Sequence, residues 1–410
     1  MSLAGLIAFI GLAWALSSQR ARFPWRTTFW GLALQFALGL LILKTTPGQA
    51  AFNGFQSVVT RFIAFADEGN KLLFGPLASP ELMEQSFGPG NSFLLIITIT
   101  GTIILISSVS SLLYHYGILQ QVVRALAWVM QRALRTSGSE TLAAAANIFM
   151  GQTEAPLVVR PYLERMTQSE LFCLMTSGFA TIAGGVLAVY TGVLKIPAGA
   201  LLTASVMSAP AALMIAKIMR PETEPSETAV GARATTERTT VNGLDAICVG
   251  AGDGMKLAIN VAAMLLAFAA LVALVNFLLG FVAGQLGWPT QKPLQELLGY
   301  LNAPFALLMG VPSKDAVVIG QMLGERIVLN EFFGYMSLAK AQPTLDPRSF
   351  QLATFALCGF ANLASVAIQI GGIGALAPSR RGDLAQLGLR AMVAGLLACY
   401  LTACVAGLLI

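Results

Sequence analysis

Residues 177–185 read SGFATIAGG, and residues 358–366 read CGFANLASV. Gly-Phe-Ala occupies the same place in both segments, and Thr181 of the first aligns with Asn362 of the second. Each segment lies in a long charge-free stretch and follows an apolar region that polar residues interrupt. A repeated motif with the same kind of region before it indicates an internal duplication of the chain.

The two interrupted regions have the pattern of helical hairpins that enter a membrane and turn back. The first is ETLAAAANIFMGQTEAPLVVRPYLERM at 140–166; the second, at 304–338, is interrupted around Asn330 and Glu331. Apolar residues flank both interruptions, so neither resembles a loop in water. Irregular backbone at membrane depth is tolerated where protein buries it or where it lines a cavity.

The composition predicts a membrane protein. Of the 410 residues, 11% are charged and 56% are hydrophobic, whereas about 25% of a soluble domain is charged. This excludes a soluble globular protein and a disordered one. Each of eight charge-free stretches can cross a hydrocarbon core, which takes about 20 helical residues: 1–19, 27–43, 85–123, 171–194, 196–216, 257–291, 349–379 and 391–410. The predicted fold class is an all-α polytopic membrane protein with eight transmembrane helices, two re-entrant hairpins in an inverted repeat, and interfacial helices.

The basic residues predict the orientation. Sixteen of the 25 Lys and Arg residues lie in four inter-span segments: Arg20, Arg22, Arg26; Arg124, Arg132, Arg135, Arg160, Arg165; Lys217, Arg220, Arg233, Arg238, Lys256; Arg380, Arg381, Arg390. With these segments in the cytoplasm, both termini lie outside the cell and the two hairpins enter from opposite sides. Such an inverted repeat is the architecture through which secondary transporters alternate access to a site near the midplane. The net charge of +5 thus follows from topology, and no nucleic-acid partner is expected.

Four segments are predicted along the chain. Residues 1–135 hold N-terminal spans, an interfacial helix and a scaffold helix; 136–220 form the first transport repeat; 221–292 hold a cytoplasmic linker and a second scaffold helix; 293–410 form the second transport repeat. The interfacial helix is predicted within 45–84 from apolar residues at helical spacing, namely Phe52, Phe55, Val59, Phe62 and Ile63. Spans 85–123 and 257–291 are longer than one crossing and are the scaffold candidates.

Several classes of function are disfavoured by the residue types. A single histidine, His115, leaves no histidine-rich metal or haem site, and five cysteines form no CxxC pair. No Ser-His-Asp, HExxH or Walker arrangement is present in the sequence. The glycine-rich QIGGIG at 369–374 lies inside a span without a preceding strand, so it predicts close helix packing rather than phosphate binding. We therefore expect a protein that is not an enzyme and has no organic cofactor.

Two glutamates predict the functional site. Glu154 and Glu331 stand in otherwise apolar segments, and an ionisable residue at membrane depth is costly and usually functional. Gln152 and Thr153 precede Glu154, between a glycine and a proline of the kind found where a hairpin unwinds. Free backbone groups and half-helix ends at such a tip can bind a polar solute and a cation.

A cation at this tip needs five or six hard oxygen ligands. Neutral side-chain oxygens are available on Asn147, Thr153 and Thr181, and the carbonyls of Met150 and Ile182 can add to them. A proton-coupled mechanism, in which one of the two glutamates titrates, stays open. For Asn362 and Ser365, interhelical hydrogen bonding is the alternative to a role in binding.

At these residues the chain resembles the concentrative nucleoside transporters. The resemblance is carried by GQTEAPLVVRPYLERMTQSEL at 151–171, GFATIAGG at 178–185, Asn-Glu-Phe at 330–332 and GFANLASVAIQIGGIG at 359–374. Members of that family are trimeric cation–nucleoside symporters with a static scaffold domain and a transport domain of two hairpins and their partner helices. Its bacterial short form has eight spans. The chain departs from the family pattern at Met150, where valine is expected, and at Ser313, where bacterial relatives usually have tryptophan.

The resemblance implies roles for individual residues. Those implied to meet the nucleobase are Gln152, Thr153, Glu154 and Val186, with Glu154 acting through water. Those implied to meet the ribose are Glu331, Asn362 and Ser365, with Phe360 nearby. The five residues named above for a cation are the implied sodium ligands.

The expected function is sodium-coupled symport of nucleosides, such as uridine or adenosine, into the cell. The expected mechanism is alternating access of the two-hairpin transport domain in a homotrimer within the lipid of the bacterial inner membrane, with Na+ as the coupling ion. Proton-coupled nucleoside symport is the alternative within transport. An ion channel or a membrane-embedded enzyme is the alternative from another class.

Overall fold

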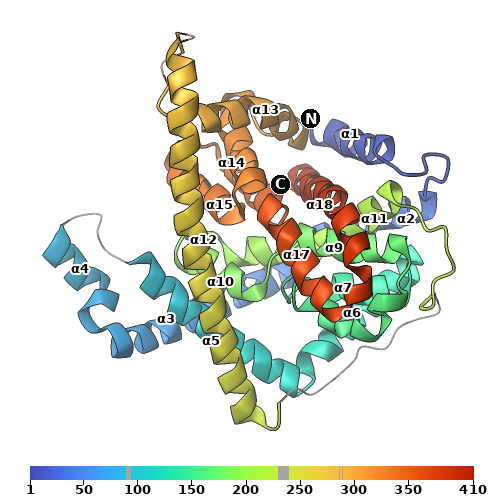
Figure 1. Cartoon of the computed structure of the whole chain (residues 1–410), viewed down its shortest axis with the longest axis horizontal. Helices are drawn as coiled ribbons and strands as arrows, with labels where there is room; N and C mark the ends of the chain where they lie inside the picture. Colours follow the sequence, from blue (N-terminus) through green and yellow to red (C-terminus); the bar gives the residue numbers. More distant parts are fainter. Residues whose placement is uncertain (89–93, 230–239, 286, 289) are drawn as a thin grey trace.

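The computed structural model describes residues 1–88, 94–229, 240–285, 287–288 and 290–410. Within these residues the regular secondary structure is helical throughout, which confirms the all-α class (Figure 1). Arg233 and Arg238, counted above among the cytoplasmic basic residues, lie outside the described residues.

Two sets of helices follow the same order along the chain, as the duplicated motif predicted. The first set is α6 (Ile118–Leu134), α7 (Gly138–Ala146), α8 (Ala155–Val158) with η2 (Arg160–Arg165), α9 (Gln168–Ala180), α10 (Gly184–Gly192) and α11 (Ala198–Met219). The second is α13 (Pro293–Met309) with η3 (Ser313–Asp315), α14 (Ala316–Val328), α15 (Glu331–Ala341) with η4 (Gln342–Thr344), α16 (Pro347–Leu357), α17 (Leu363–Leu376) with η5 (Pro378–Arg380), and α18 (Arg381–Leu409). The other elements are α1 (Ser2–Ala15), α2 (Trp25–Lys44), α3 (Thr46–Phe74), η1 (Gly75–Ala78), α4 (Pro80–Phe87), α5 (Leu95–His115) and α12 (Gly243–Gln285).

The repeated motif is unwound in both copies. Thr181 and Asn362 have extended backbones, and each follows the end of a helix, α9 or α16. The hydroxyl of Thr181 donates back to the Ser177 carbonyl at 2.9 Å, and the N–H of Phe360 donates to the Thr181 carbonyl at 3.3 Å. A Cβ on Gly359 would lie 2.6 Å from the Phe179 carbonyl oxygen. The two breaks therefore contact each other through backbone.

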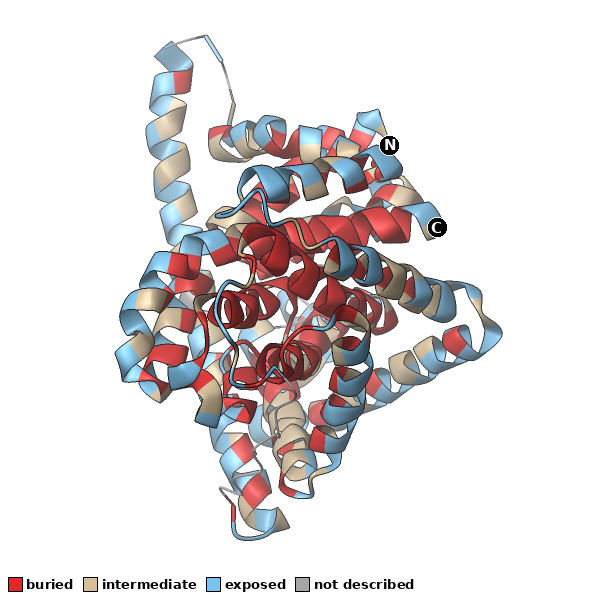
Figure 2. Cartoon of the chain, turned by 90° about the vertical axis from the view of Figure 1, so that its right-hand side faces the viewer, coloured by how far each residue is buried: buried red, intermediate tan, exposed pale blue. Residues whose placement is uncertain are grey.

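Among the described residues, six helical segments are long and apolar enough to cross a membrane. Predicted spans 1–19 and 349–379 contain shorter apolar helices instead, Ser2–Ala15 and Leu363–Leu376, the latter because the motif breaks that span. Buried residues concentrate in the central helices and exposed ones on the outer helices (Figure 2). The eight crossings stay a prediction.

The prediction of one long helix over 85–123 is wrong. This stretch contains the end of α4, all of α5 and the start of α6. α5 ends at His115, and Gly117 follows with a φ of 75°, a conformation that glycine adopts at little cost. The second hairpin also begins later than residue 304, because α13 continues to Met309 before Gly310 (φ 98°) and Pro312 end it. Its interruption lies between Val328 and Glu331, where the polar residues predicted it.

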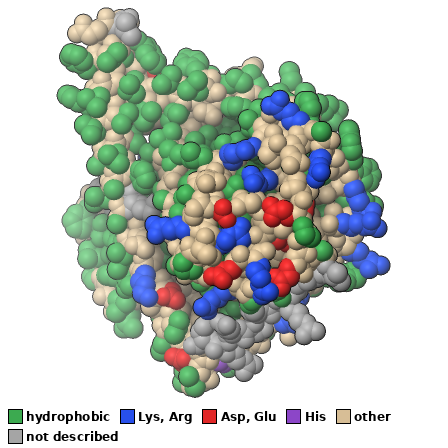
Figure 3. All heavy atoms as spheres, turned by 45° about the vertical axis from the view of Figure 1, so that its right-hand side comes forward, with side chains coloured by type: hydrophobic (Ala, Val, Ile, Leu, Met, Phe, Trp, Pro, Cys, Tyr) green, Lys and Arg blue, Asp and Glu red, His purple; other side chains and the backbone are tan. Residues whose placement is uncertain are grey.

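The other scaffold candidate is a single helix of 43 residues, α12, which stands along one side of the molecule (Figure 1). It packs on α5 through glycines: a Cβ on Gly250 would lie 2.6 Å from the Ser107 carbonyl oxygen, and one on Gly254 would lie 2.8 Å from the Ile104 Cα. Its protruding end is covered with hydrophobic side chains, whereas charged side chains of both signs gather on another face (Figure 3).

The predicted interfacial helix corresponds to α3, and its apolar residues face protein as well as the surface. Val59 is buried, and Phe52, Phe55 and Ile63 are half-buried. A Cβ on Gly199 of α11 would lie 2.6 Å from the Phe52 ring. α3 is therefore packed against the helical core along one side.

Candidate functional site

Hairpin 1 (α7, α8 and η2) and hairpin 2 (α14 and α15) both contact the start of α17. Asn362, Ser365 and Gln369 are spaced at i, i+3 and i+7, so they share one helical face, and all three are buried. Asn362 caps the helix, because its side-chain Oδ1 accepts the Ser365 N–H at 2.8 Å. The side-chain amide of Asn362 is thereby left to donate to another group.

Hairpin 2 contributes Glu331, which begins α15 after the N-cap Asn330. The Glu331 carboxylate is buried; it accepts the Tyr190 hydroxyl at 2.7 Å and the Asn362 amide Nδ2 at 3.1 Å. Both of these donors are neutral. A carboxylate has more acceptor positions than these two bonds use, so it can accept further hydroxyl donors.

Hairpin 1 contributes Gln152 from its unwound tip. Its Nε2 donates to the Ser365 hydroxyl at 3.0 Å, and its Oε1 accepts the Gln369 Nε2 at 3.0 Å. A Cβ on Gly178 would lie 3.0 Å from the Gln152 Cβ, so the motif's glycine admits the tip. The four residues Gln152, Ser365, Asn362 and Glu331 thus form one continuous chain of hydrogen bonds between the hairpins.

The other four predicted substrate residues are outside this chain of hydrogen bonds. Thr153 and Glu154 are exposed, and a Glu154 carboxylate oxygen lies 3.5 Å from the Gly151 nitrogen. Val186 and Phe360 are half-buried and pack against the core. A ligand site is usually mostly apolar and contains a few precisely placed polar groups. The exposed polar side chains and half-buried apolar side chains beside this buried network match that description.

Four of the five predicted cation ligands are buried in two segments that contact each other, the hairpin 1 tip and the break after α9. The Gly184 N–H donates to the Phe149 carbonyl at 3.2 Å, which joins the two segments. Asn147 uses its amide Nδ2 on the Ala143 carbonyl at 3.0 Å, whereas its Oδ1 is buried without a partner in the described residues.

Thr181 is also buried there, as are Ile182 and Met150. Among the described residues, no group of three or more His, Cys, Asp or Glu side chains could hold a metal ion. An orphaned amide oxygen among neutral oxygens fits a hard monovalent cation better than a transition metal.

Sequence reasoning missed Tyr190 and Gln369. Tyr190 is fully buried in α10, and a buried tyrosine hydroxyl usually has a hydrogen-bond partner. This rule predicts that the Tyr190 hydroxyl has a partner, but it does not identify Glu331 as that partner. Gln369 belongs to the stretch interpreted as helix packing; its i+7 spacing from Asn362 was the available signal.

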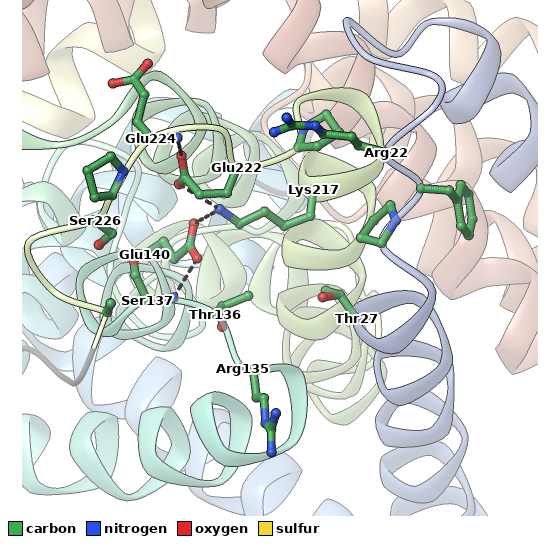
Figure 4. A pocket seen from close by; sticks show the side chains of 15 residues that line it. Arg22, Thr27, Arg135, Thr136, Ser137, Glu140, Lys217, Glu222, Glu224 and Ser226 are labelled. Atoms are coloured by element: carbon green, nitrogen blue, oxygen red, sulfur yellow. Dashed lines mark hydrogen bonds and ion pairs between the residues drawn. The ribbon is translucent and has the colours of Figure 1, made fainter.

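A separate polar cleft of about 560 Å³ lies at the base of hairpin 1 (Figure 4). Arg22, Arg135 and Lys217 line it, and these come from three of the segments predicted to lie in the cytoplasm. Buried Lys217 pairs with Glu140 at 2.7 Å and with Glu222 at 3.4 Å. This cleft shares no lining residue with the network on α17.

Comparison with known proteins identifies the family of the chain. Family models described as the Na+ dependent nucleoside transporter N-terminus and C-terminus match residues 4–77 and 200–407, and a "Nucleoside recognition" model matches 96–197. An uncharacterised transporter of Haemophilus influenzae is 43% identical over 100% of this chain and 97% of its own length. Solute carrier family 28 member 3 of Rattus norvegicus is 39% identical over 100% of this chain, which spans 58% of that relative.

Among solved structures, the transporter CNTnw in an inward-facing substrate-bound state has a TM-score of 0.93 and 40% identity, covering 99% of this chain and 96% of that one. The matching families and relatives are transporters and not enzymes. The N- and C-terminal family models together cover more than half of the sequence, and the bacterial relative matches it from end to end. The chain therefore belongs to the family of Na+ dependent nucleoside transporters.

Proposed function

We propose that this protein carries nucleosides into the bacterial cell together with Na+, as a homotrimer in the inner membrane with both termini outside. The observation that carries the proposal is the buried network that joins Gln152, Ser365, Asn362 and Glu331. A carboxylate buried among neutral donors at membrane depth is costly. A solute with several hydroxyl groups would supply it with the donors that it lacks.

The ribose of a nucleoside fits the hairpin 2 side. Glu331 accepts hydrogen bonds and the Asn362 amide donates one, so the two together suit a pair of vicinal hydroxyls. Ser365, which accepts from Gln152, lies between this pair and hairpin 1. Phe360 would pack beside the sugar.

The nucleobase fits the hairpin 1 side. The Gln152 amide presents a donor and an acceptor, which is the pattern needed for the polar edge of a base. Thr153 and Glu154 are exposed and free to meet a base directly or through water, and Val186 would cover its face. Because the two hairpins hold different ends of one solute, binding would couple their positions.

Na+ fits the junction of the hairpin 1 tip with the break after α9. The unpartnered Oδ1 of Asn147, the Thr181 hydroxyl and the carbonyls of Met150 and Ile182 are neutral oxygens of the kind that hold Na+ in broken-helix transporters. Thr153 would link the ion to the solute as a shared ligand. This sharing is a physical route for coupling, because each ligand would order the same tip.

The transport step would be movement of the two hairpins and their partner helices against a scaffold that includes α5 and α12. The exposed apolar face of α12 suits lipid or neighbouring protomers. Uptake of radiolabelled uridine into vesicles, with external Na+ replaced by choline at fixed pH, tests the coupling ion. Loss of uptake supports Na+ coupling; unchanged uptake that instead follows a pH gradient would favour proton coupling.

The ribose assignment is tested by Glu331→Gln, which keeps the shape of the side chain but removes its charge. We expect loss of uridine uptake and of the thermal stabilisation that uridine confers. Glu325→Gln is the matched control, because Glu325 is a buried acid on the same hairpin whose carboxylate accepts the Gln321 amide at 3.1 Å and is not part of the network on α17. Normal uptake by Glu331→Gln would contradict the assignment.

The ion assignment is tested by Thr181→Val. We expect a rise in the Na+ concentration needed for half-maximal uptake, with little change in apparent uridine affinity at saturating Na+. Thr203→Val is the control, since the Thr203 hydroxyl also donates back one turn, to Gly199 at 2.7 Å, but in α11. Equal loss of both affinities would argue against Thr181 as a ligand.

A further inference from the structure

Arg326 is a buried cation that the proposed function does not use. It lies near the end of α14, on the first arm of hairpin 2, and is 0% exposed. Its Nη1 donates to the Ala356 carbonyl, and the guanidinium carbon lies 5.3 Å from the centre of the Tyr400 ring. Its Nε and Nη2 groups have no hydrogen-bond partner within the described residues.

No carboxylate lies within ion-pair distance of Arg326 in the part of the chain that the structure describes. The adjacent Glu325 accepts a hydrogen bond from Gln321 at 3.1 Å. The buried Glu331 accepts from Tyr190 and Asn362 and attracts Arg326 at longer range, without a direct ion pair. An unpaired buried charge is strongly destabilising. Its presence in hairpin 2 therefore calls for a compensating interaction.

That interaction is with the carbonyl end of α16. Ala356 lies in the last turn of this helix, immediately before the break at the repeated motif. The last carbonyls of a helix lack partners within it and carry the negative end of the helix dipole, so a cation there is favourable. Neighbouring carbonyls have neutral donors, such as the Tyr335 hydroxyl on Thr354 at 2.8 Å.

The matching end of α9 in the first repeat differs in one respect. Met175 is aligned with Ala356 by the motif, and its carbonyl accepts the neutral Gln369 amide at 3.2 Å. Further along, Ser177 accepts from the Thr181 hydroxyl and Ala180 from the Cys399 thiol. These three donors are uncharged, and Thr181 and Ile182, two of the proposed Na+ ligands, directly follow this end of α9.

We propose that Arg326 is a tethered cation for the second repeat: it neutralises the carbonyl end of α16, while the corresponding end of α9 takes a free ion. The proposal rests on the proposed function, since a free cation at the first break is part of it. Arg326 acts through the broken helix and does not touch the solute. It is thus a positioning residue that keeps the α14 arm seated on α16.

Arg326→Met and Arg326→Lys form the primary test, because the two side chains have similar length and differ in charge. Replacing a buried charge by an apolar residue of similar volume is often neutral or stabilising. We expect Arg326→Met to melt at or above the wild-type temperature yet to lose about tenfold in uridine uptake at saturating Na+. Arg326→Lys should keep most of its uptake. Wild-type uptake by Arg326→Met, or equal losses in both variants, would overturn the proposal.

Arg326→Ala provides a second measurement that does not depend on the Met variant. It removes the guanidinium and leaves space at the carbonyl end of α16, so guanidinium ion at non-denaturing concentration should restore uptake about fivefold or more. Urea, the neutral analogue of similar shape, should not. Rescue by urea, or no rescue by guanidinium, would contradict the need for charge. All variants are measured in Na+, and wild type is also measured with Na+ replaced by choline. Unchanged wild-type uptake in choline would refute the proposed coupling and not the role of Arg326.

Discussion

Tyr190→Phe tests whether Glu331 is aimed at the ribose by its neighbours. Tyr190 is fully buried, and its hydroxyl donates to a Glu331 carboxylate oxygen at 2.7 Å. Its ring packs on Phe332 and Tyr335, with centroids 6.0 and 4.7 Å apart. Phenylalanine keeps these ring contacts, so the substitution removes one hydrogen bond and little else.

The size of the effect follows from the charge of the acceptor. A hydrogen bond to a charged group contributes about 1.5–3 kcal/mol. Glu331 retains the Asn362 amide at 3.1 Å, so the lower end of that range applies. A difference of about 1.4 kcal/mol is tenfold in an equilibrium constant. We therefore expect uridine to bind Tyr190→Phe about tenfold more weakly than wild type.

The assay compares uridine with 2′,3′-dideoxyuridine as competitors of labelled uridine uptake. If Tyr190 orients Glu331 toward the hydroxyls, the preference for uridine over the dideoxy compound should shrink by the same factor as uridine affinity. Competition between different bases should not change, because the proposed base site is on the hairpin 1 side. The preference is thus a readout that general destabilisation does not move.

Tyr335→Phe is the matched control. Tyr335 is also fully buried, and its hydroxyl donates to the Thr354 carbonyl at 2.8 Å rather than to Glu331. It should lower the melting temperature without changing the preference for uridine. The reasoning fails if Tyr190→Phe keeps the wild-type preference within twofold, or if Tyr335→Phe reduces it equally.

Three further substitutions have expected outcomes. Gln369→Leu removes the amide that donates to the Gln152 side-chain carbonyl oxygen at 3.0 Å. Because an unpaired buried acceptor costs about 1–3 kcal/mol, discrimination among bases should fall in competition uptake, whereas the preference for ribose hydroxyls should not change. Lys217→Met leaves buried Glu140 without its ion-pair partner at 2.7 Å, which should cost about 3–5 kcal/mol in thermal unfolding. Gly250→Val places side-chain atoms where a Cβ would already lie 2.6 Å from backbone of α5, so it should separate α5 from α12 and lower the melting temperature.

Each of the last two has a control substitution of the same kind. Lys256→Met removes a lysine whose pair with Asp253, at 3.0 Å, is exposed on both sides, so the melting temperature should hardly change. Gly252→Val is on the same helix as Gly250, but no atom lies within 4 Å of a Cβ there. Equal destabilisation by Gly250→Val and Gly252→Val would contradict the packing of α12 on α5.

The repeat and its polar interruptions could be predicted because they depend on local sequence. Polar residues inside an apolar stretch, next to glycine and proline, mark the places where a helix cannot continue through a membrane, and Glu331 and Asn362 lie at such places. Helix ends that depend on backbone conformation were harder to predict. Gly117 and Gly310 end helices with positive φ, yet each lies in an apolar stretch whose composition resembles a continuous span.

The partners of site residues could not be predicted, since periodicity within an apolar span shows a helix without showing which face meets another segment. Tyr190 precedes Glu331 by 141 residues, and Gln369 follows Gln152 by 217. Only the tertiary arrangement brings these pairs together. A polar residue with no local partner was the available signal, and it indicates that a partner exists without identifying it.

The duplication predicts where the helices break, but the chemistry depends on where the two copies differ. At aligned positions, Thr181 is replaced by Asn362: the hydroxyl bonds back to its own helix, whereas the amide donates to Glu331. Met175 and Ala356 align likewise, with a neutral donor on one carbonyl and a guanidinium on the other. If both copies had kept the same side chains, both breaks would favour the same kind of ligand. Under the proposed function, divergence at these few positions would let one break bind an ion and the other bind the hydroxyls of a solute.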